Sequence, residues 1–436
     1  MTKYLAAAWT CAAILIASTS SLAEDSSANG SEAAVDYSQW VAKLESPFFK
    51  DRQAASRELA RGGRKAIPAL ADAVHNGGLE SITRSLSILS EFHFAEDETL
   101  ARESRSALDE IRETIGSQRR SRVIGAIDRI QSGWQAEAVS RLRSMKASVS
   151  EYNDRITTVD IDEKWTGGDH GLRYLRYLKG TKTLNFPDSS ITDVGLAYLA
   201  PLQDVQILRL GRTSVRGPGL VHLQKMSSLM FLSLKGSKLE PGAMKHLAGC
   251  NKLQSLGLDD TNVTNEDLSH IHGLPDLRNI WLNQTKVTDE GLAHLKKHQG
   301  LYKIIMTGLD IKGPGLAHLA ELNNLEYLSL QYVKLEDAGM PYVGQLTQVK
   351  TLGLDDTLVG DAGMKYLSTL NTNLDTLWLS NTKVTDESLE HFKKLTTVRR
   401  IVLRGTKVSK EGVEQLRKAL PKCTVEHDYE DEQKNR

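Results

Sequence analysis

The stretch Leu277–Gly300, LRNIWLNQTKVTDEGLAHLKKHQG, decides the fold because its pattern returns along most of the chain. Its first half alternates apolar and polar residues, which is typical of a short strand with one buried face. Its second half predicts a short helix, with Thr288 as the N-cap and Asp289 in the first turn, where a carboxylate favours the helix dipole. One unit is therefore a strand, a turn and a short helix.

The pattern repeats every 24 residues, with one step of 25 where an extra residue lies near Thr372 and Asn373. Ten regular units and one irregular leading unit at Ile156 follow from this spacing. The first apolar position of nine units falls at Val205, Leu229, Leu253, Leu277, Leu301, Leu325, Val349, Leu374 and Val398. A longer period is also present, because LGLDDT at Leu256–Thr261 returns at Leu352–Thr357, and it indicates that a block of four units was duplicated.

These repeats resemble those of leucine-rich repeat proteins, in the 24-residue variety common in exported bacterial proteins. The motif that carries the resemblance is L-x-x-L-x-L-x-x-T-x-V-T-D-E-G-L-x-x-L, and its units cover residues 156–425. The resemblance implies an α/β solenoid, a horseshoe whose parallel strands form a concave sheet. Neighbouring strands are expected about 4.8 Å apart.

Residues 37–148 follow a helical pattern instead. The segments KDRQAASRELARGG and KAIPALADAVHNGG each carry an apolar stripe and end in a glycine pair, which is typical of a helix C-terminus. Residues 46–91 resemble HEAT-type repeats, and this resemblance implies an all-α HEAT-like domain. We expect it to cap one end of the solenoid, because an open end would expose core and strand edge.

The two ends of the chain predict export and little structure. Residues 1–23 combine a positively charged start, an apolar run and the small-residue motif Ser21-Leu22-Ala23, which is typical of a cleaved secretory signal peptide. We expect cleavage before Glu24, a flexible linker over 24–36 and a charged tail over 426–436. The predicted localisation is exported, whether periplasmic, cell-envelope or secreted, without stable membrane insertion.

The charge balance argues against nucleic acid as a partner. Lys plus Arg and Asp plus Glu both number 55, so the chain has no basic excess. The sequence contains no Ser-His-Asp set, phosphate-binding loop or zinc-ligand spacing. It therefore predicts no catalytic residue, no metal and no cofactor.

Cys250 and Cys423 are the two cysteines that follow the signal segment. Seven units separate them, which is about 34 Å at the expected strand spacing. A disulfide needs Cα atoms within about 7 Å of each other. We therefore expect two free thiols and no disulfides.

Two further columns recur at the repeat spacing. A hydroxyl is expected to satisfy backbone groups of the neighbouring turn in eight units, at Ser189, Thr213, Ser237, Thr261, Thr285, Thr357, Thr382 and Thr406. Leu309 and Val333 interrupt this ladder, so we expect looser or bent stacking there. Half-buried rings on the outer helices are expected at His222, His246, His270, His294 and His318. A metal-binding or pH-sensing role is the alternative for these imidazoles.

Function is expected on the concave face. Trp281 and Trp378 occupy solvated strand positions, and aromatic side chains are frequent binding anchors. Trp281 is predicted to form one anchor patch with Ile305, Phe231 and Tyr327, and Trp378 a second patch. Each Trp follows a glycine one strand earlier, so the alternative is that its ring only covers bare backbone.

The aspartates of LGLDDT are predicted to be polar rims of these patches and not an active site. Asp259 and Asp355 lie four units apart, about 19 Å, whereas the carboxylate pair of a glycoside hydrolase needs about 5–9.5 Å. Lys235 is expected to flank Asp259 on one side and Asn283 on the other.

The sequence thus predicts an exported, non-catalytic scaffold that binds a protein or peptide on its concave face. The first alternative is a carbohydrate-binding protein that stacks sugar rings on Trp281 and Trp378. A further alternative is a substrate receptor of a ubiquitin ligase, because GCNKLQSLGL is similar to the cysteine-containing repeats of F-box proteins. The predicted signal peptide and the lack of an F-box-like segment in the sequence argue against it.

Overall fold

The computed structural model describes residues 36–95, 97–153 and 155–429, which form two units divided between Gln131 and Ser132. The expected signal peptide and nearly all of the expected linker lie outside the described residues, as does the chain after 429. Each unit is described by itself below.

The first unit is helical, as predicted, and its resemblance to HEAT repeats stays a prediction. It contains α2 (Ser38–Lys43), α3 (Phe49–Arg61), the 3₁₀ turn η2 (Gly63–Ala66), α4 (Ile67–Asn76), α5 (Leu79–His93) and α6 (Glu98–Thr114), and α7 (Ser117–Ser144) begins in it. Its core includes Leu59, Leu70, Leu86 and Leu108, all buried. The Asp97 carboxylate starts α6 by accepting hydrogen bonds from the backbone N–H groups of Thr99 and Leu100.

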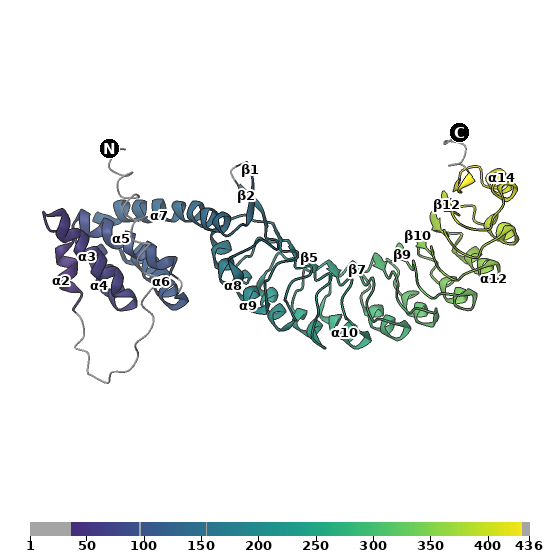
Figure 1. The fold of residues 1–436 in the computed structure, drawn as a ribbon, viewed down its shortest axis with the longest axis horizontal. Helices are drawn as coiled ribbons and strands as arrows, with labels where there is room; N and C mark the ends of the chain where they lie inside the picture. Colours follow the sequence, from purple (N-terminus) through teal and green to yellow (C-terminus); the bar gives the residue numbers. More distant parts are fainter. Residues whose placement is uncertain (1–35, 96, 154, 430–436) are drawn as a thin grey trace. The chain divides into compact units, whose positions relative to one another are not determined.

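The second unit is a solenoid with one 13-stranded sheet in chain order, which confirms the expected parallel sheet. It opens with an antiparallel hairpin of β1 (Ser148–Tyr152) and β2 (Arg155–Asp160). The parallel strands that follow β2 are β3 (Thr183–Asn185), β4 (Ile207–Arg209), β5 (Phe231–Ser233), β6 (Ser255–Gly257), β7 (Asn279–Trp281), β8 (Lys303–Ile305), β9 (Tyr327–Ser329), β10 (Thr351–Gly353), β11 (Thr376–Trp378), β12 (Arg400–Val402) and β13 (Thr424–Glu426). Within this unit the strands line the inner side of the curve and the helical segments its outer side (Figure 1).

The register places equivalent residues of successive units side by side. The middle residue of each three-residue strand enters the core, as Leu232, Leu256 and Ile280 show with no exposed surface. The first and third residues face the inner side, because strand side chains alternate; we call these the first-position and third-position columns. Leu352 pairs with Leu377, so the extra residue of that unit is absorbed outside the sheet.

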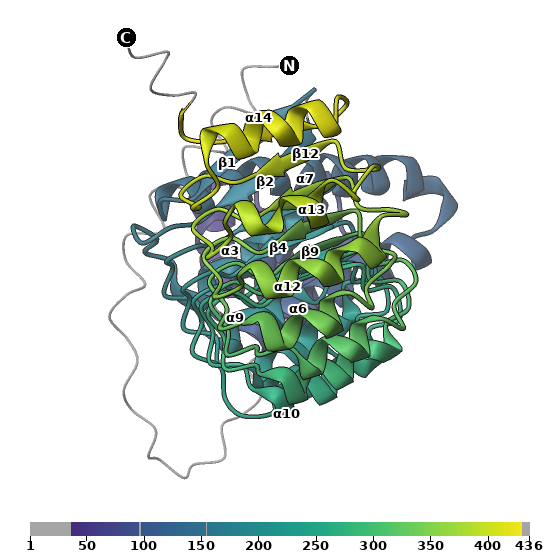
Figure 2. The same cartoon turned by 90° about the vertical axis from the view of Figure 1, so that its right-hand side faces the viewer.

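The outer side is built mainly from 3₁₀ turns and single α-turns, where the sequence predicted short helices. These segments are α8 (Gly168–Gly171), η3 (Leu172–Tyr177), α9 (Asp193–Leu196), η4 (Ala197–Leu199), η5 (Pro218–Lys225), η6 (Ala243–Leu247), α10 (Asn265–Ser269), η7 (His270–Gly273), η8 (Asp289–Lys297), η9 (Pro314–Leu319), η10 (Asp337–Gly339), α11 (Met340–Val343), α12 (Asp361–Met364), η11 (Lys365–Leu370), η12 (Asp386–Ser388), α13 (Leu389–Phe392) and α14 (Lys410–Ala419). Figure 2 shows α10, α12, α13 and α14 succeeding one another along the unit. Thr288 occupies the N-cap position of η8, as predicted, but its side chain makes no capping hydrogen bond.

Aspartates at the start of the outer segments join neighbouring units. The Asp289 carboxylate, expected only to favour a helix dipole, accepts hydrogen bonds from the backbone N–H groups of Gly313 and Gly315 in the next unit, at 3.1 and 2.8 Å. Asp193 does the same for Gly217 and Gly219. These bonds satisfy backbone donors that stacking takes away from water.

The hydroxyl ladder acts as predicted at Ser237, whose hydroxyl donates to the carbonyl of Leu210 in the preceding unit at 3.3 Å, and differently at the other positions. The hydroxyl of Thr261 donates to the carbonyl of Leu258 at 2.6 Å, so it closes the turn of its own unit and does not reach the neighbouring one. Where the ladder is interrupted, Leu309 and Val333 are each only 2% exposed. The strands beside them stay in register, so the expected loosening of the stacking is absent there.

The remaining sequence features fall in the core or on the outer side. Cys250 and Cys423 are buried free thiols, and burial raises the pKa of each thiol to about 11. Four of the five column histidines are half-buried on the outer side, and His294 is exposed. In residues 36–429, apart from the two omitted positions, no three His, Cys, Asp or Glu side chains are arranged to hold a metal, and no helix can span a bilayer.

His298 is a polar residue in an otherwise apolar column. The equivalent positions one unit before and after hold Leu274 and Leu322, which are completely buried, and His298 is itself 4% exposed. Its Nδ1 atom lies 3.2 Å from the carbonyl oxygen of Leu274, but its Nε2 atom has no hydrogen-bond partner among the described residues. Burial lowers the pKa of the imidazole below its ordinary value of about 6.5.

We expect His298→Leu to raise the free energy of unfolding by about 1–2 kcal/mol at pH 7.5, because it removes an unpartnered buried polar atom. The unfolded chain binds a proton on this imidazole more readily than the folded chain. The wild type therefore loses stability as the pH falls below about 6.5, and the gain grows at pH 5.5.

Urea unfolding at the two pH values measures this, with His294→Leu as the matched control at an exposed histidine. Equal losses of stability by wild type and His298→Leu between pH 7.5 and 5.5 would contradict the assignment.

Candidate functional site

The inner face of the sheet carries two aromatic clusters with the same construction. The N-terminal cluster consists of Arg209, Phe231, Gly257, Trp281 and Ile305, and the C-terminal cluster of Lys303, Tyr327, Gly353, Trp378 and Val402. In each cluster the Trp stands in the third-position column with a glycine one strand before it and a β-branched aliphatic residue one strand after it.

In the N-terminal cluster, Phe231 on β5 meets Trp281 on β7 across the intervening strand. Their ring centroids lie 6.1 Å apart at an interplanar angle of 60°, an edge-to-face contact. The guanidinium carbon of Arg209 lies 5.1 Å from the Phe231 centroid, and the guanidinium donates to the Asn185 side chain at 2.7 Å. The contact between Arg209 and the Phe231 ring adds a cation–π attraction to the ring pair.

The C-terminal cluster repeats the arrangement four units later. Tyr327 and Trp378 have ring centroids 5.9 Å apart at 66°, and the ammonium of Lys303 lies 4.3 Å from the Tyr327 centroid. Tyr327 therefore belongs with Trp378, and its predicted place in the patch of Trp281 is wrong. Burial, followed by the nearby Asp355 charge, raises the pKa of the Tyr327 hydroxyl, so this hydroxyl stays protonated at neutral pH.

The glycine in each cluster leaves room for the rings. A Cβ atom added at Gly353 would lie 3.1 Å from Cε3 of Trp378, so this ring covers the glycine backbone. At Gly257 the closest atoms belong to Ser233, at 3.3 Å and beyond. The covering of bare backbone is thus seen for Trp378, but both Trp rings also pack on a second aromatic ring.

The predicted polar rim is a structural ladder between units. The Asp259 carboxylate accepts from the backbone N–H of Asn283 at 3.1 Å, and the Asn283 side-chain oxygen accepts from that of Thr307 at 2.7 Å. The Asp355 carboxylate accepts from the backbone N–H of Ser380 at 2.6 Å and from the Gln331 amide at 2.7 Å. Burial raises the pKa of Asp259, and the bond from Asn283 opposes that rise.

The second aspartate of each LGLDDT segment turns away from the first. Asp260 and Asp356 both have φ of +57°, a left-handed turn conformation. The Lys235 ammonium lies 3.6 Å from a carboxylate oxygen of Asp260, and its charge also acts on the flanking Asp259, whose pKa it lowers against the larger effect of burial. The two aspartates of one copy do not form a carboxylate pair.

Sequence reasoning missed Arg209 and Lys303 as members of the site. The strand order was a usable signal, because Arg209 lies on the strand before that of Phe231, where it pairs with Ser233, and Lys303 pairs directly with Tyr327. Neither cation forms a salt bridge with an acidic residue within the described part of the chain. Each cluster therefore combines half-buried aromatic surface with one cation that has no salt-bridge partner among the described residues, and the Asp355 carboxylate lies near the C-terminal cluster.

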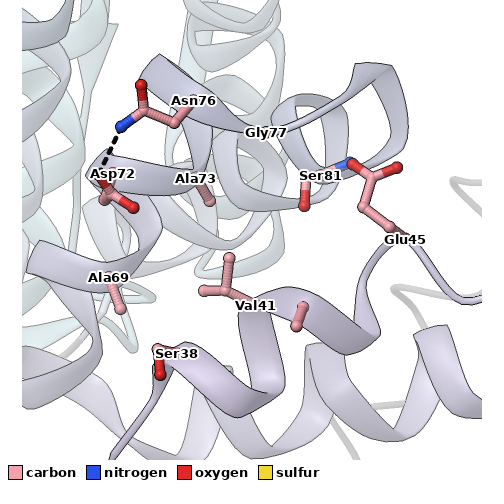
Figure 3. A pocket seen from close by; sticks show the side chains of 10 residues that line it. Ser38, Val41, Glu45, Ala69, Asp72, Ala73, Asn76, Gly77 and Ser81 are labelled. Atoms are coloured by element: carbon pink, nitrogen blue, oxygen red, sulfur yellow. Dashed lines mark hydrogen bonds between the residues drawn. The ribbon is translucent and has the colours of Figure 1, made fainter.

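A hollow of about 330 Å³ between α2, α4 and the start of α5 is a competing site in the first unit (Figure 3). Its acidic groups already have local partners. Glu45 accepts from the backbone N–H of Ser81 at 3.0 Å, and Asp72 accepts from the Asn76 amide at 2.7 Å. These contacts hold helix ends and side chains together, so the inner face of the sheet is the stronger candidate.

The strand order and register define the class of fold, a leucine-rich repeat solenoid preceded by a helical region. No protein-family profile matches the chain, and no curated protein is similar to it.

Solved structures with similar chains include two internalins of Listeria monocytogenes. One is an internalin with 20% identity and a TM-score of 0.41, covering 69% of this chain and 94% of its own. The other is internalin C2, with 18% identity and a TM-score of 0.34, covering 54% and 84%. A third is the leucine-rich repeat ectodomain of an Arabidopsis thaliana receptor kinase, GASSHO1/SCHENGEN3, solved in complex with CASPARIAN STRIP INTEGRITY FACTOR 2. It has 19% identity and a TM-score of 0.38, and covers 58% of this chain and 36% of its own.

The ring contact at Gly353 predicts that the two cluster glycines respond differently to substitution. Gly353→Ala is expected to lower the free energy of unfolding by about 1 kcal/mol more than Gly257→Ala, because its methyl group overpacks the Trp378 ring. Urea unfolding of both variants measures the difference. The same pair of substitutions in a Trp378→Ala background is the control, and the difference should vanish there; a difference that persists would show that Trp378 does not cover this glycine.

Proposed function

We propose that this chain is a non-catalytic binding protein whose inner sheet face holds a protein or peptide partner. The observation that carries the proposal is the pair of aromatic clusters, with Trp281 and Trp378 half-buried on a face that is otherwise solvated. Trp, Tyr and Arg are enriched among the residues that dominate binding energy. The rings of the two clusters are already held by edge-to-face contacts, so binding costs them little conformational entropy.

A carbohydrate that stacks on Trp281 and Trp378 is the second candidate. A sugar ring also needs hydrogen-bonding groups beside its aromatic platform. Among the polar groups beside the clusters, Asp259, Asn283 and Asp355 each already accept a hydrogen bond from the backbone of the next unit. Apolar anchors of a peptide need no such groups, which favours the peptide.

We also propose that the chain is exported, on the strength of the signal-like pattern in residues 1–23. Mass spectrometry of the protein recovered from expressing cells tests this, with Glu24 expected at the N-terminus. Recovery of only the uncleaved chain would contradict the proposal of export.

Panning a phage-displayed library of random peptides on the purified protein tests the binding function. We expect selected peptides to lose at least about tenfold in affinity for Trp281→Ala and for Trp378→Ala, which is the loss of one anchor side chain. Tyr302→Ala is the matched control, because this tyrosine is 47% exposed and belongs to neither cluster.

A glycan array probed with the same proteins separates the second candidate. If no peptide is enriched, and if the protein binds a glycan that Trp281→Ala no longer binds, the partner is a carbohydrate and not a peptide.

A further inference from the structure

We infer that the two clusters grip one ligand together: an extended acidic peptide segment in which two carboxylates alternate with two bulky apolar side chains. This inference rests on the proposed peptide-binding function and specifies its ligand. Three independent features of the inner face lead to it.

The first feature is the equivalence of the two clusters. Phe231 and Tyr327, Gly257 and Gly353, and Trp281 and Trp378 occupy equivalent positions of the duplicated four-unit block. The ring geometries agree closely, with centroid distances of 6.1 and 5.9 Å and angles of 60° and 66°. Two like sites on one continuous sheet face favour a ligand with like groups at two points along its length.

The second feature is the charge between the two ends of the face. From β3 to β12, the first-position and third-position columns contain Arg209, Lys303 and Arg400 and no carboxylate. Asp259 and Asp355 lie two residues beyond the third position, and their carboxylates accept hydrogen bonds from backbone N–H groups of the next unit. Arg400 is paired with Glu426 at 2.7 Å. Arg209 and Lys303 instead face the rings of their clusters, and no acidic residue of the described chain pairs with either. A ligand that neutralises them has to bring its own carboxylates.

The third feature is the spacing of these groups along the face. Arg209, Trp281, Lys303 and Trp378 lie on β4, β7, β8 and β11. With strands about 4.8 Å apart, the last three lie about 14, 19 and 34 Å beyond the first. An extended peptide advances about 3.3 Å per residue. Its carboxylates then fall near positions 1 and 7 and its apolar anchors near positions 5 and 11.

A single peptide that reaches both clusters binds with higher affinity than two separate ligands. Once the first anchor is seated, the second binds from a high effective concentration, so the two contacts multiply. The residues between the two Trp in the third-position column are Ile305, Ser329 and Gly353, which leave no bulky polar side chain in the path.

The probe is an eleven-residue fluorescein-labelled synthetic peptide with Asp at positions 1 and 7, Phe at positions 5 and 11, and Ser or Thr elsewhere. It is made in both chain directions, because the register does not define which way the ligand runs. The control peptide has the same composition with its two Phe adjacent. Fluorescence anisotropy measures binding to the full chain and to Trp281→Ala, Trp378→Ala, Lys303→Gln and the control Tyr302→Ala, after circular dichroism has shown that each variant is folded.

We expect one direction of the probe to bind at least about tenfold tighter than the control peptide. Each Trp→Ala variant should weaken it by about thirtyfold, Lys303→Gln should weaken it less and reduce its salt dependence, and Tyr302→Ala should leave it unchanged. Equal binding of the probe and the control peptide, or a loss of affinity in only one Trp variant, would overturn the inference that one ligand contacts both clusters. The proposed function would still stand if library-selected peptides bind. Failure of every library peptide to bind would overturn the proposed function itself.

Discussion

The parallel pairing of short strands at a constant 24-residue offset is the constraint on which the rest of this structure depends. The middle residue of each strand is buried completely, as at Leu232, Leu256 and Ile280, and each such side chain contributes about 1.5–3 kcal/mol of hydrophobic stabilisation. A slip of one residue would turn these side chains out and bring the inner face into the core. The register that stabilises the solenoid therefore also determines which side chains meet on its inner face.

Polar residues of the repeat hold neighbouring units together and leave the rings to face the solvent. Asp289 joins its turn to the next unit by accepting from three backbone N–H groups, and Asp259 accepts from one beside the N-terminal cluster. A carboxylate that accepts backbone hydrogen bonds stabilises the folded chain more than a carboxylate that is only hydrated. The paired aspartates, which at first sight suggest a catalytic or metal site, thus act in stacking, and the aromatic residues remain as the distinctive feature of the face.

Much of this could be predicted from the sequence, because a period held over ten units specifies strand order and facing. Trp281 and Trp378 were identifiable as inner-face residues for that reason. The partner of each ring was not, since Phe231 reaches Trp281 across a whole strand and only the side-chain conformation decides that. Likewise, the pairing of Lys235 with Asp260 depends on a left-handed turn that could not be predicted from the sequence LGLDDT.

The central claim, that both Trp clusters contact one ligand, is tested most directly by fluorine NMR. The protein is labelled with 5-fluorotryptophan, and the signals of Trp281 and Trp378 are assigned by single Trp→Phe variants. Titration with the tightest library-selected peptide should shift both signals together, saturating at one peptide per chain, while the signal of the buried Trp165 stays in place. If the protein is saturated with peptide and the signal of either Trp281 or Trp378 has not moved, the account is contradicted.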